Sequence, residues 1–205
     1  MLFVKKCEFS IEDLRRLSKT SRMKTEYPKL ILTALSIIGL PGCATTAKDL
    51  PVQTTVSRVD IQRFMGPWHV IAAIPTRFET YAYNPIETYH WNEKEKRIDI
   101  HYTFNKESFV GLKKEIPQTG FIHDETTNAE WRIRPFWPLS FSYLIVELAP
   151  DYSDAVVGVS NRKHVWIMSR SPQMSQSRYE ELVNKVGALG YDTSKLQKFP
   201  QQTIE

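Results

Sequence analysis

From Asp60 onward, short runs of β-branched and aromatic residues recur about every ten residues, with turn-forming residues between them. In residues 97–104 every second residue is apolar or aromatic, which is the period of a strand that buries one face. We expect strands near 68–74, 86–91, 97–104, 113–122, 129–134, 142–148, 155–160 and 164–169. Eight short strands in succession predict an all-β fold in which an antiparallel up-and-down sheet closes into an eight-stranded β-barrel.

One late segment follows the helical period instead. In residues 177–189 the apolar side chains fall on one stripe of a helix, and Gly190 ends it. We therefore expect a single C-terminal α-helix that is appended to the barrel.

Length and composition fit one folded domain. The chain has 205 residues, of which 41% are apolar and 12% are aromatic. This is enough for one full hydrophobic core and argues against a disordered chain. Both cysteines, Cys7 and Cys43, lie in the first quarter of the chain. Disulfides therefore do not hold the expected barrel together.

The basic character of the chain is confined to its beginning. Residues 1–42 contain eight of the 27 lysines and arginines and four of the 23 acidic residues, so 19 of each sign remain from Cys43 onward. A neutral body lacks the positive surface that binds nucleic acid, and we expect no nucleic-acid partner.

Residues 30–40 form the only long apolar run in the sequence. The run has 11 residues, fewer than the roughly 20 that a helix needs to span a bilayer. With Lys24 and Lys29 before it, the run is typical of the apolar region of a secretory signal. A compact signal of this kind would begin at Met23, which is therefore a candidate for the true start of the protein.

The four residues Leu-Pro-Gly-Cys that end at Cys43 resemble the lipobox of bacterial lipoproteins. The resemblance implies cleavage before Cys43, acylation of this cysteine, and lipid anchoring in the outer membrane, facing the periplasm. We divide the chain into a leader (1–42), the acylated cysteine with a tether (43–59), and the barrel with its helix (60–205). The alternative is a buried helix over residues 30–40 with Cys43 as a core cysteine.

Three motifs follow in a fixed order along the expected barrel. Gly66-Pro67-Trp68 begins the first strand, residues 151–154 form the turn before the seventh, and residues 166–170 end the last strand with an arginine. Together with the late helix they resemble the motifs of lipocalins, especially the bacterial outer-membrane lipoproteins related to apolipoprotein D. The resemblance covers about residues 58–200 and implies a lipid-binding barrel.

The resemblance also implies which residues close one end of the barrel. Gly66, Trp68, Tyr152 and Arg170 are the expected closure residues, and the Arg170 guanidinium is expected to pack across the Trp68 ring. If Arg170 shares the inner face with Trp68, period two turns Trp166 and Met168 inward. By the same parity, Ala72 would face a cavity above Trp68. These residues could equally fill a packed barrel.

The turns expected at the open end of the barrel, its mouth, carry seven basic and two acidic side chains and most of the loop aromatics. An apolar pocket with a basic rim suits an acyl chain with an anionic head, such as a fatty acid or a lysophospholipid. The candidate ligand-binding residues are Ala72, Arg77, Phe78, Tyr102, Phe104, Trp131, Arg134, Phe136, Arg162, Trp166 and Met168.

Other function classes have less support in the sequence. The five histidines are scattered, without the spacing that gathers a metal ion, and no nucleophile or phosphate-binding motif is present. We expect no metal, no cofactor and no enzymatic activity, and lipid, membrane and a homodimer as partners. Two alternatives stay open: a structural or interaction lipoprotein with a filled barrel, and a lipid-modifying enzyme. Binding of a fluorescent fatty acid without turnover would distinguish a carrier from both.

Overall fold

A computed structural model describes residues 53–135 and 138–202. A short helix α1 (Ile61–Phe64) precedes the strands, and α2 (Gln176–Ala188) and a 3-10 turn η3 (Thr193–Lys195) follow them. The strands are β1 (Gly66–Ile74), β2 (Ala82–Asn92), β3 (Arg97–Lys106), β4 (Lys113–Ile122), β5 (Glu130–Arg134), β6 (Phe141–Leu148), β7 (Asp154–Gly158), β8 (Val165–Ser169) and the short β9 (Gln197–Lys198).

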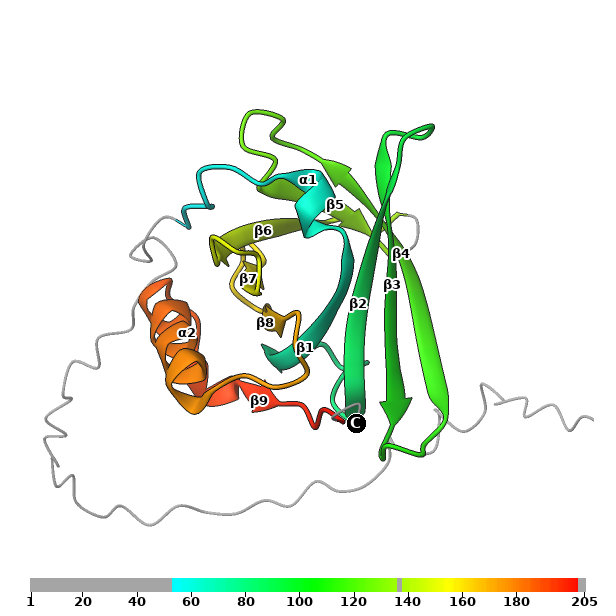
Figure 1. The fold of residues 1–205 in the computed structure, drawn as a ribbon, viewed down its shortest axis with the longest axis vertical. Coiled ribbons are helices and arrows are strands. Elements are labelled where there is room, and N and C mark those ends of the chain that lie inside the picture. The colour runs from blue at the N-terminus through cyan, green and yellow to red at the C-terminus, as the bar shows by residue number, and fades with distance from the viewer. Residues whose placement is uncertain (1–52, 136–137, 203–205) are drawn as a thin grey trace, which may run out of the picture. The chain divides into compact units, whose positions relative to one another are not determined.

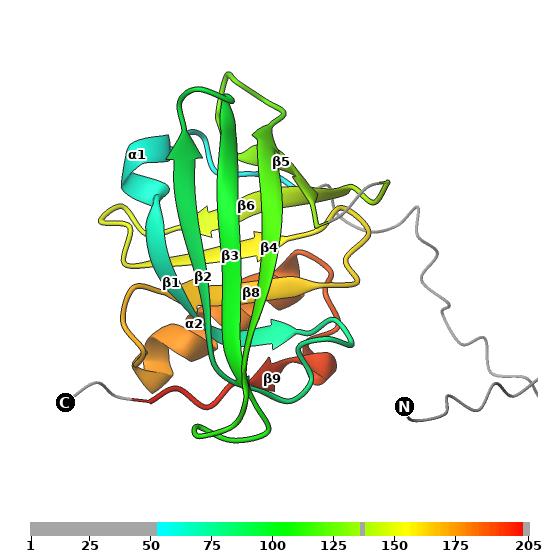
Figure 2. The same ribbon diagram turned by 90° about the vertical axis from the view of Figure 1, so that its right-hand side faces the viewer.

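The strands from β1 to β8 form one antiparallel sheet that closes on itself. Each pairs with the next in sequence, and β1 pairs with both β2 and β8 (Figure 1). The expected eight-stranded barrel with a C-terminal helix is thereby confirmed. In Figure 2 the long strands β2, β3 and β4 run in front, and β6 and β8 cross behind them at a steep angle. No helix in the described ranges is long and apolar enough to cross a membrane.

One end of the barrel is covered by α1 and the other carries the long loops. β1 starts beside α1 at Gly66, so the hairpins β2–β3, β4–β5 and β6–β7 share this closed end. The connections β1–β2, β3–β4, β5–β6 and β7–β8 lie at the mouth. The Asp60 side chain caps α1 by accepting from the Arg63 N–H, which turns Phe64 into the core. The short helix α1 was not among the elements expected from the sequence.

A β-bulge in β1 changes which face its later residues occupy. Val70 pairs with Met168, but Ala72, not Ile71, pairs with Ile167, so Ile71 is the extra residue. After the bulge the alternation is reversed. Val70 packs in the inner core, whereas Ala72 packs on the outer face. The expectation that Ala72 faces the cavity is therefore wrong, because it assumed an unbroken period of two.

Helix α2 lies along the outside of the barrel (Figure 1). Its buried residues Leu182 and Val186 pack with Ala72, Val156 and Ile167 in a second core cluster. Ser175 caps its first turn by accepting from the Arg178 N–H. The Arg178 side chain makes two hydrogen bonds, of 2.7 and 3.0 Å, with Asp154. The helix therefore packs against β7 and β8 on the outside of the barrel and supports them.

The C-terminal segment closes a gap that the barrel strands leave. β1 and β2 pair only near the closed end, from Gly66 to His69. Toward the mouth β9 pairs with Ala72 and Ala73, and the Gln201 side-chain amide donates to the carbonyls of Val70 and Pro85. Phe199 joins the inner core. A two-residue strand has no periodicity, and the sequence did not predict it.

Candidate functional site

Five aromatic side chains pack together inside the closed end, and we call them the aromatic floor: Phe64, Trp68, Tyr89, Trp131 and Tyr143. The Phe64 ring lies 5.0 Å from Trp68 and 5.3 Å from Trp131, centroid to centroid. Trp131 and Tyr143 stack at 5.1 Å. The Trp68 indole donates to the Phe64 carbonyl at 2.8 Å. All five side chains are buried, so this end of the barrel is solid.

Arg170 fastens the floor to α1. Its guanidinium carbon lies 3.9 Å from the centroid of the Trp68 ring. It also donates to the backbone carbonyls of Arg63, Phe64, Met65 and Pro67 at 2.8 to 3.1 Å. These carbonyls follow the end of a short helix, where they have few intrahelical donors. One cation thus satisfies four acceptors and stacks on an indole.

Gly66 and Tyr152 complete the closed end. Gly66 has a φ of 92°, and a Cβ at this position would lie 3.4 Å from the Arg170 side chain. A residue other than glycine would strain this backbone. The Tyr152 hydroxyl accepts from the Asp60 N–H at 2.8 Å, and the Arg63 guanidinium lies 4.0 Å from its ring centroid. The structure therefore places all four expected closure residues at one end.

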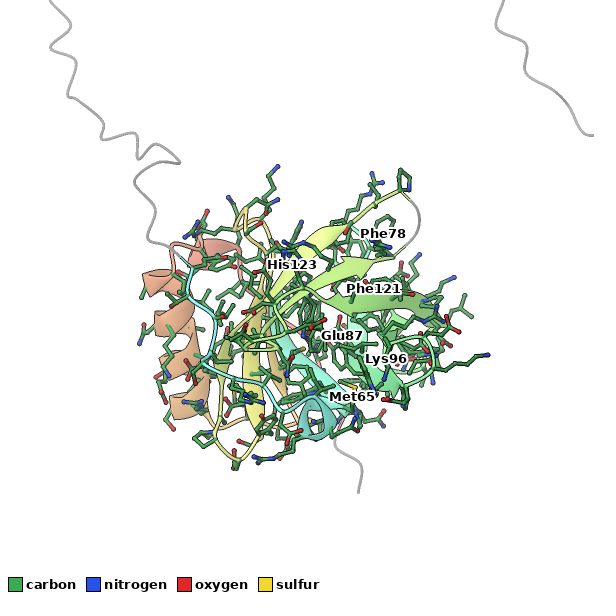
Figure 3. All side chains as sticks on the ribbon, turned by 90° about the horizontal axis from the view of Figure 1, so that it is seen from above. Met65, Phe78, Glu87, Lys96, Phe121 and His123 are labelled. Carbon is green, nitrogen blue, oxygen red and sulfur yellow. The ribbon has the colours of Figure 1, made fainter. Side chains whose placement is uncertain are left out.

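Above the floor, buried polar groups lie among the apolar side chains of the barrel interior. We call Glu79, Glu87 and Tyr102 the inner polar layer. Glu87 lies two residues before Tyr89 on the same face of β2, and its cross-strand partner is Tyr102. Figure 3 looks from the side of α1 and shows Glu87 near the middle of the view, with Phe78 and Lys96 farther out. Two carboxylates and a phenol thus line the middle of the barrel.

Glu87 is 8% exposed and accepts a hydrogen bond from the Tyr89 hydroxyl, which in turn contacts the Tyr143 hydroxyl. Burial raises the pKa of Glu87 from its ordinary value of 4.5 to about 7, with a smaller contribution from the negative charge of Glu79. Burial also raises the pKa values of Tyr89 and Tyr143. The carboxyl of Glu87 therefore changes charge near neutral pH, and the two phenols stay neutral.

Glu79 ties the β1–β2 connection to the last strand of the barrel. One carboxylate oxygen accepts from the Thr76 N–H at 2.7 Å, and the other accepts from the Trp166 indole at 2.9 Å. The side chain is buried, with 6% exposure. Trp166 itself is partly buried and packs against the inner core. This contact holds the Trp166 indole at the mouth end of the inner face.

The Tyr102 hydroxyl is buried and has no hydrogen-bond partner within the described part of the chain. Its ring packs on Phe104 with centroids 5.4 Å apart. Burial raises the pKa of Tyr102, and the charges of Glu79 and Glu87 raise it further. The hydroxyl is therefore neutral and unsatisfied beside two carboxylates.

The mouth is apolar on its outside. In the described ranges, the exposed large hydrophobic side chains all lie in or next to three mouth connections: Phe78, Tyr81, Phe109, Val110, Leu112, Leu139 and Phe141. Phe78 is 60% exposed and Val110 is 96% exposed. Exposed apolar side chains that gather at one end of a barrel are candidates for contact with an apolar ligand or surface.

Apart from the exposed Phe78 and the three arginines, the candidate ligand-binding residues fall into three groups. Tyr102, Phe104, Trp131 and Met168 lie in the inner core, and Trp166 packs against it. Ala72 lies outside the barrel beneath α2. Phe136 falls outside the described residues, as does Cys43 with the whole leader.

The structure does not bring the three expected rim arginines together. Arg77 lies over the exposed Phe78 ring, with 5.0 Å between its guanidinium carbon and the ring centroid. Arg134 lies over Phe121, and both side chains are on the outer face of the barrel. Arg162 donates to the Leu189 carbonyl at the end of α2. These cations do not form a common binding site for an anionic head.

The sequence analysis missed Glu79 and Glu87. Glu87 could have been recognised from the sequence, because it alternates in step with Tyr89 and Trp91. Strand alternation therefore predicts that its side chain faces inward. Glu79 lies in a connection without periodicity, so only the folded structure shows its contact with Trp166. No group of three or more metal-binding side chains occurs in the described part of the chain.

Comparisons with known proteins agree with this architecture. The family model for the lipocalin-like domain matches residues 59–201. Temperature-induced lipocalin-1 of Arabidopsis thaliana is 31% identical over 171 residues, covering 77% of this chain and 86% of that protein. The outer membrane lipoprotein Blc of Escherichia coli K12 is 26% identical over 166 residues, covering 81% and 92%.

Solved structures share the fold at lower identity. Insecticyanin from the tobacco hornworm Manduca sexta superposes with a TM-score of 0.57 at 20% identity, covering 75% of this chain and 86% of that one. Lobster apocrustacyanin A1 gives a TM-score of 0.56 at 16% identity, covering 70% and 81%.

Proposed function

This chain belongs to the lipocalin family, and on that premise we propose that it is a membrane-anchored lipocalin that binds or carries a single-chain lipid, of the fatty acid or lysophospholipid class, inside its barrel. The observation that carries the proposal is the contrast between a solid aromatic floor and a mouth with exposed apolar loops. A barrel that is closed at one end and apolar around the other admits an apolar chain from the mouth.

The inner face between floor and mouth supports this proposal. Ile116 and Trp166 are only partly buried although they pack against the inner core. In a barrel filled by its own side chains, these inner-face residues would be covered. Their partial exposure fits an acyl chain that covers them when it binds.

Anchoring at the outer membrane is the second part of the proposal. It rests on the lipobox that ends at Cys43 and on the similarity to relatives that are named outer membrane lipoproteins. Two or more acyl chains hold a protein on a bilayer, at about 0.8 kcal/mol per buried methylene. The expected tether over residues 43–59 is too long, because Val56 and Val59 hydrogen-bond to the barrel and Val59 is buried in its core. Residues 44–52 would then act as a tether of at most about 30–32 Å, which lets the mouth approach the bilayer.

Binding and anchoring can be tested separately. The delipidated protein is titrated with a fluorescent fatty acid and then incubated with phospholipid. Saturable binding without turnover is the expected result. Turnover would support a lipid-modifying enzyme, and the absence of binding would support an interaction protein with a filled barrel.

For the anchor, Cys43→Ala is compared with the wild type by membrane fractionation and intact mass. We expect the variant to leave the membrane fraction. A variant that stays with the outer membrane at the wild-type mass would contradict the lipoprotein assignment.

A further inference from the structure

The inner polar layer has an unbalanced charge. Glu79 and Glu87 are both buried, and neither forms an ion pair with a Lys, Arg or His within the described residues. The other buried carboxylate in that part of the chain, Asp154, is paired with Arg178 on the outside of the barrel at 2.7 Å. Buried charges are normally paired, because desolvation is costly. Glu79 and Glu87 therefore share the barrel interior without a counter-ion from the described residues.

Tyr102 provides an independent sign of a missing partner. Its side chain is 2% exposed, and its hydroxyl oxygen is unsatisfied. Leaving a buried hydroxyl without a hydrogen bond costs about 1–3 kcal/mol. It lies across from Glu87 on the neighbouring strand, and both glutamates act on it electrostatically. An unpaired hydroxyl, which can both donate and accept, thus faces the same space as two carboxyl groups.

A fatty acid bound tail first would press its alkyl chain against the buried carboxyl group of Glu87. Its carboxylate would lie at the mouth, which carries exposed apolar side chains together with exposed lysines such as Lys113 and Lys114. Arg77, Arg134 and Arg162 do not converge to receive it. A ligand with its polar end inside and its chain toward Phe104, Ile116 and the mouth matches both regions.

Building on the proposed lipid-binding function, we propose that the inner polar layer is the subsite for an aliphatic ammonium group, and that the ligand binds head inward. An ammonium offers three N–H donors and no acceptor. The Glu87 carboxylate and the Tyr102 oxygen accept two of them, and Glu79 adds a second negative charge. The alkyl chain then runs past Phe104 and Trp166 to the apolar mouth.

The test uses three ligands that differ only in the head group. The delipidated full chain is titrated by calorimetry with dodecylamine, dodecanol and dodecanoate near pH 8, where Glu87 is ionised. The amine is expected to bind at least about tenfold more tightly than the carboxylate, a difference of about 1.4 kcal/mol. The alcohol is expected to lie between them, because it hydrogen-bonds without a charge.

Two interior variants and one control assign the effect to the layer. Glu87→Gln keeps the shape of the side chain and removes its charge. It should lower the ratio of the dodecylamine affinity to the dodecanoate affinity about tenfold. Tyr102→Phe should weaken amine binding by several-fold without loss of stability, since it deletes an unsatisfied hydroxyl. Glu125→Gln removes an exposed carboxylate at the closed end and should leave the ratio unchanged.

The outcomes separate this inference from the proposed function. Dodecanoate binding as tightly as dodecylamine, or a ratio that Glu87→Gln and Tyr102→Phe leave unaltered, would overturn the ammonium subsite while lipid binding stands. A failure of all three ligands to bind would overturn the lipid-binding function and this inference together.

Discussion

At the closed end of the barrel, Arg170 satisfies four carbonyls and stacks on a buried indole, whereas at the mouth seven large apolar side chains are exposed. In the floor, the aromatic side chains contact one another. The mouth leaves its aromatic residues in solvent, where they add little to folding. Between them lie two buried carboxylates without counter-ions. We infer that stability is concentrated in the floor and ligand chemistry in the half above it.

The largest expected effect is on the floor. Trp68→Ala removes a fully buried side chain that contacts Phe64 and supports Arg170. We expect a loss of roughly 3–5 kcal/mol in the free energy of unfolding, measured by urea denaturation. A loss below about 1 kcal/mol would show that the floor does not carry the stability of the barrel.

The next effect distinguishes the floor from the layer above it by pH. Glu87 keeps its proton up to about pH 7 in the folded protein but loses it near pH 4.5 when unfolded. Between these values the unfolded chain binds fewer protons at this group, so the contribution of Glu87 to stability is fully present below pH 4.5 and is lost as pH rises through 7. The expected loss from this group is about 3 kcal/mol. Tyr89, Tyr102, Tyr143 and Glu79 face it, and the three phenols remain neutral in this window.

Glu87→Gln should abolish that slope and make the protein more stable than the wild type near pH 8. Subtracting the stability curve of the variant from that of the wild type removes the contribution of the exposed carboxylates, which the two proteins share. A difference that does not change with pH would contradict the assignment of a buried, protonated Glu87.

A smaller effect tests whether the floor acts as one unit. Arg170→Ala should cost about 2 kcal/mol, because carbonyl groups near α1 lose a charged donor. In a double-mutant cycle with Trp68→Ala, the combined loss should be less than the sum by about 1 kcal/mol. Strict additivity in chemical denaturation would mean that the guanidinium and the indole are energetically independent.

The smallest stability effect is expected at the mouth. Phe78 is exposed, and within the described residues its ring contacts a cation only at Arg77. Phe78→Ser should change the free energy of unfolding by no more than about 0.5 kcal/mol. The same variant should take up a fluorescent lipid from vesicles more slowly. Unchanged uptake would separate the apolar loops from lipid entry.

The parts of the molecule that could be predicted from the sequence are those with a regular period. Alternation along 97–104 and the helical stripe over 177–189 correspond to β3 and α2 because neither segment contains an irregularity. Ala72 could not be placed, since the bulge at Ile71 reverses the alternation and leaves no local mark in the sequence. The two-residue β9 is fixed by hydrogen bonds to distant backbone, which no local pattern records.

The site divides in the same way. Strand alternation from Arg170 predicts that Trp166 and Met168 face the barrel interior. The same alternation, counted from Tyr89, would have predicted that Glu87 faces inward. The contact between Glu79 and Trp166 could not be predicted, because it joins a loop to a strand 87 positions away. Arg77, Arg134 and Arg162 were predicted to lie together because their loops share one end of the barrel. In the structure each side chain contacts a different partner, which the position of a loop does not reveal: Phe78, Phe121 and the carbonyl at the end of α2, respectively.

The central claim, a rigid floor beneath a lipid-binding half, is tested most directly by nuclear magnetic resonance of the tryptophan indole N–H groups. The Trp68 and Trp131 indoles donate to the backbone carbonyls of Phe64 and Asn128 at the closed end, and the Trp166 indole donates to Glu79 beside the mouth. Assignment uses Trp166→Phe, and dodecylamine is then added stepwise to the delipidated protein. The account predicts a saturable shift of the Trp166 signal, while the Trp68 and Trp131 signals stay in place. Signals that all stay in place, or a Trp68 signal that moves as much as that of Trp166, would contradict it.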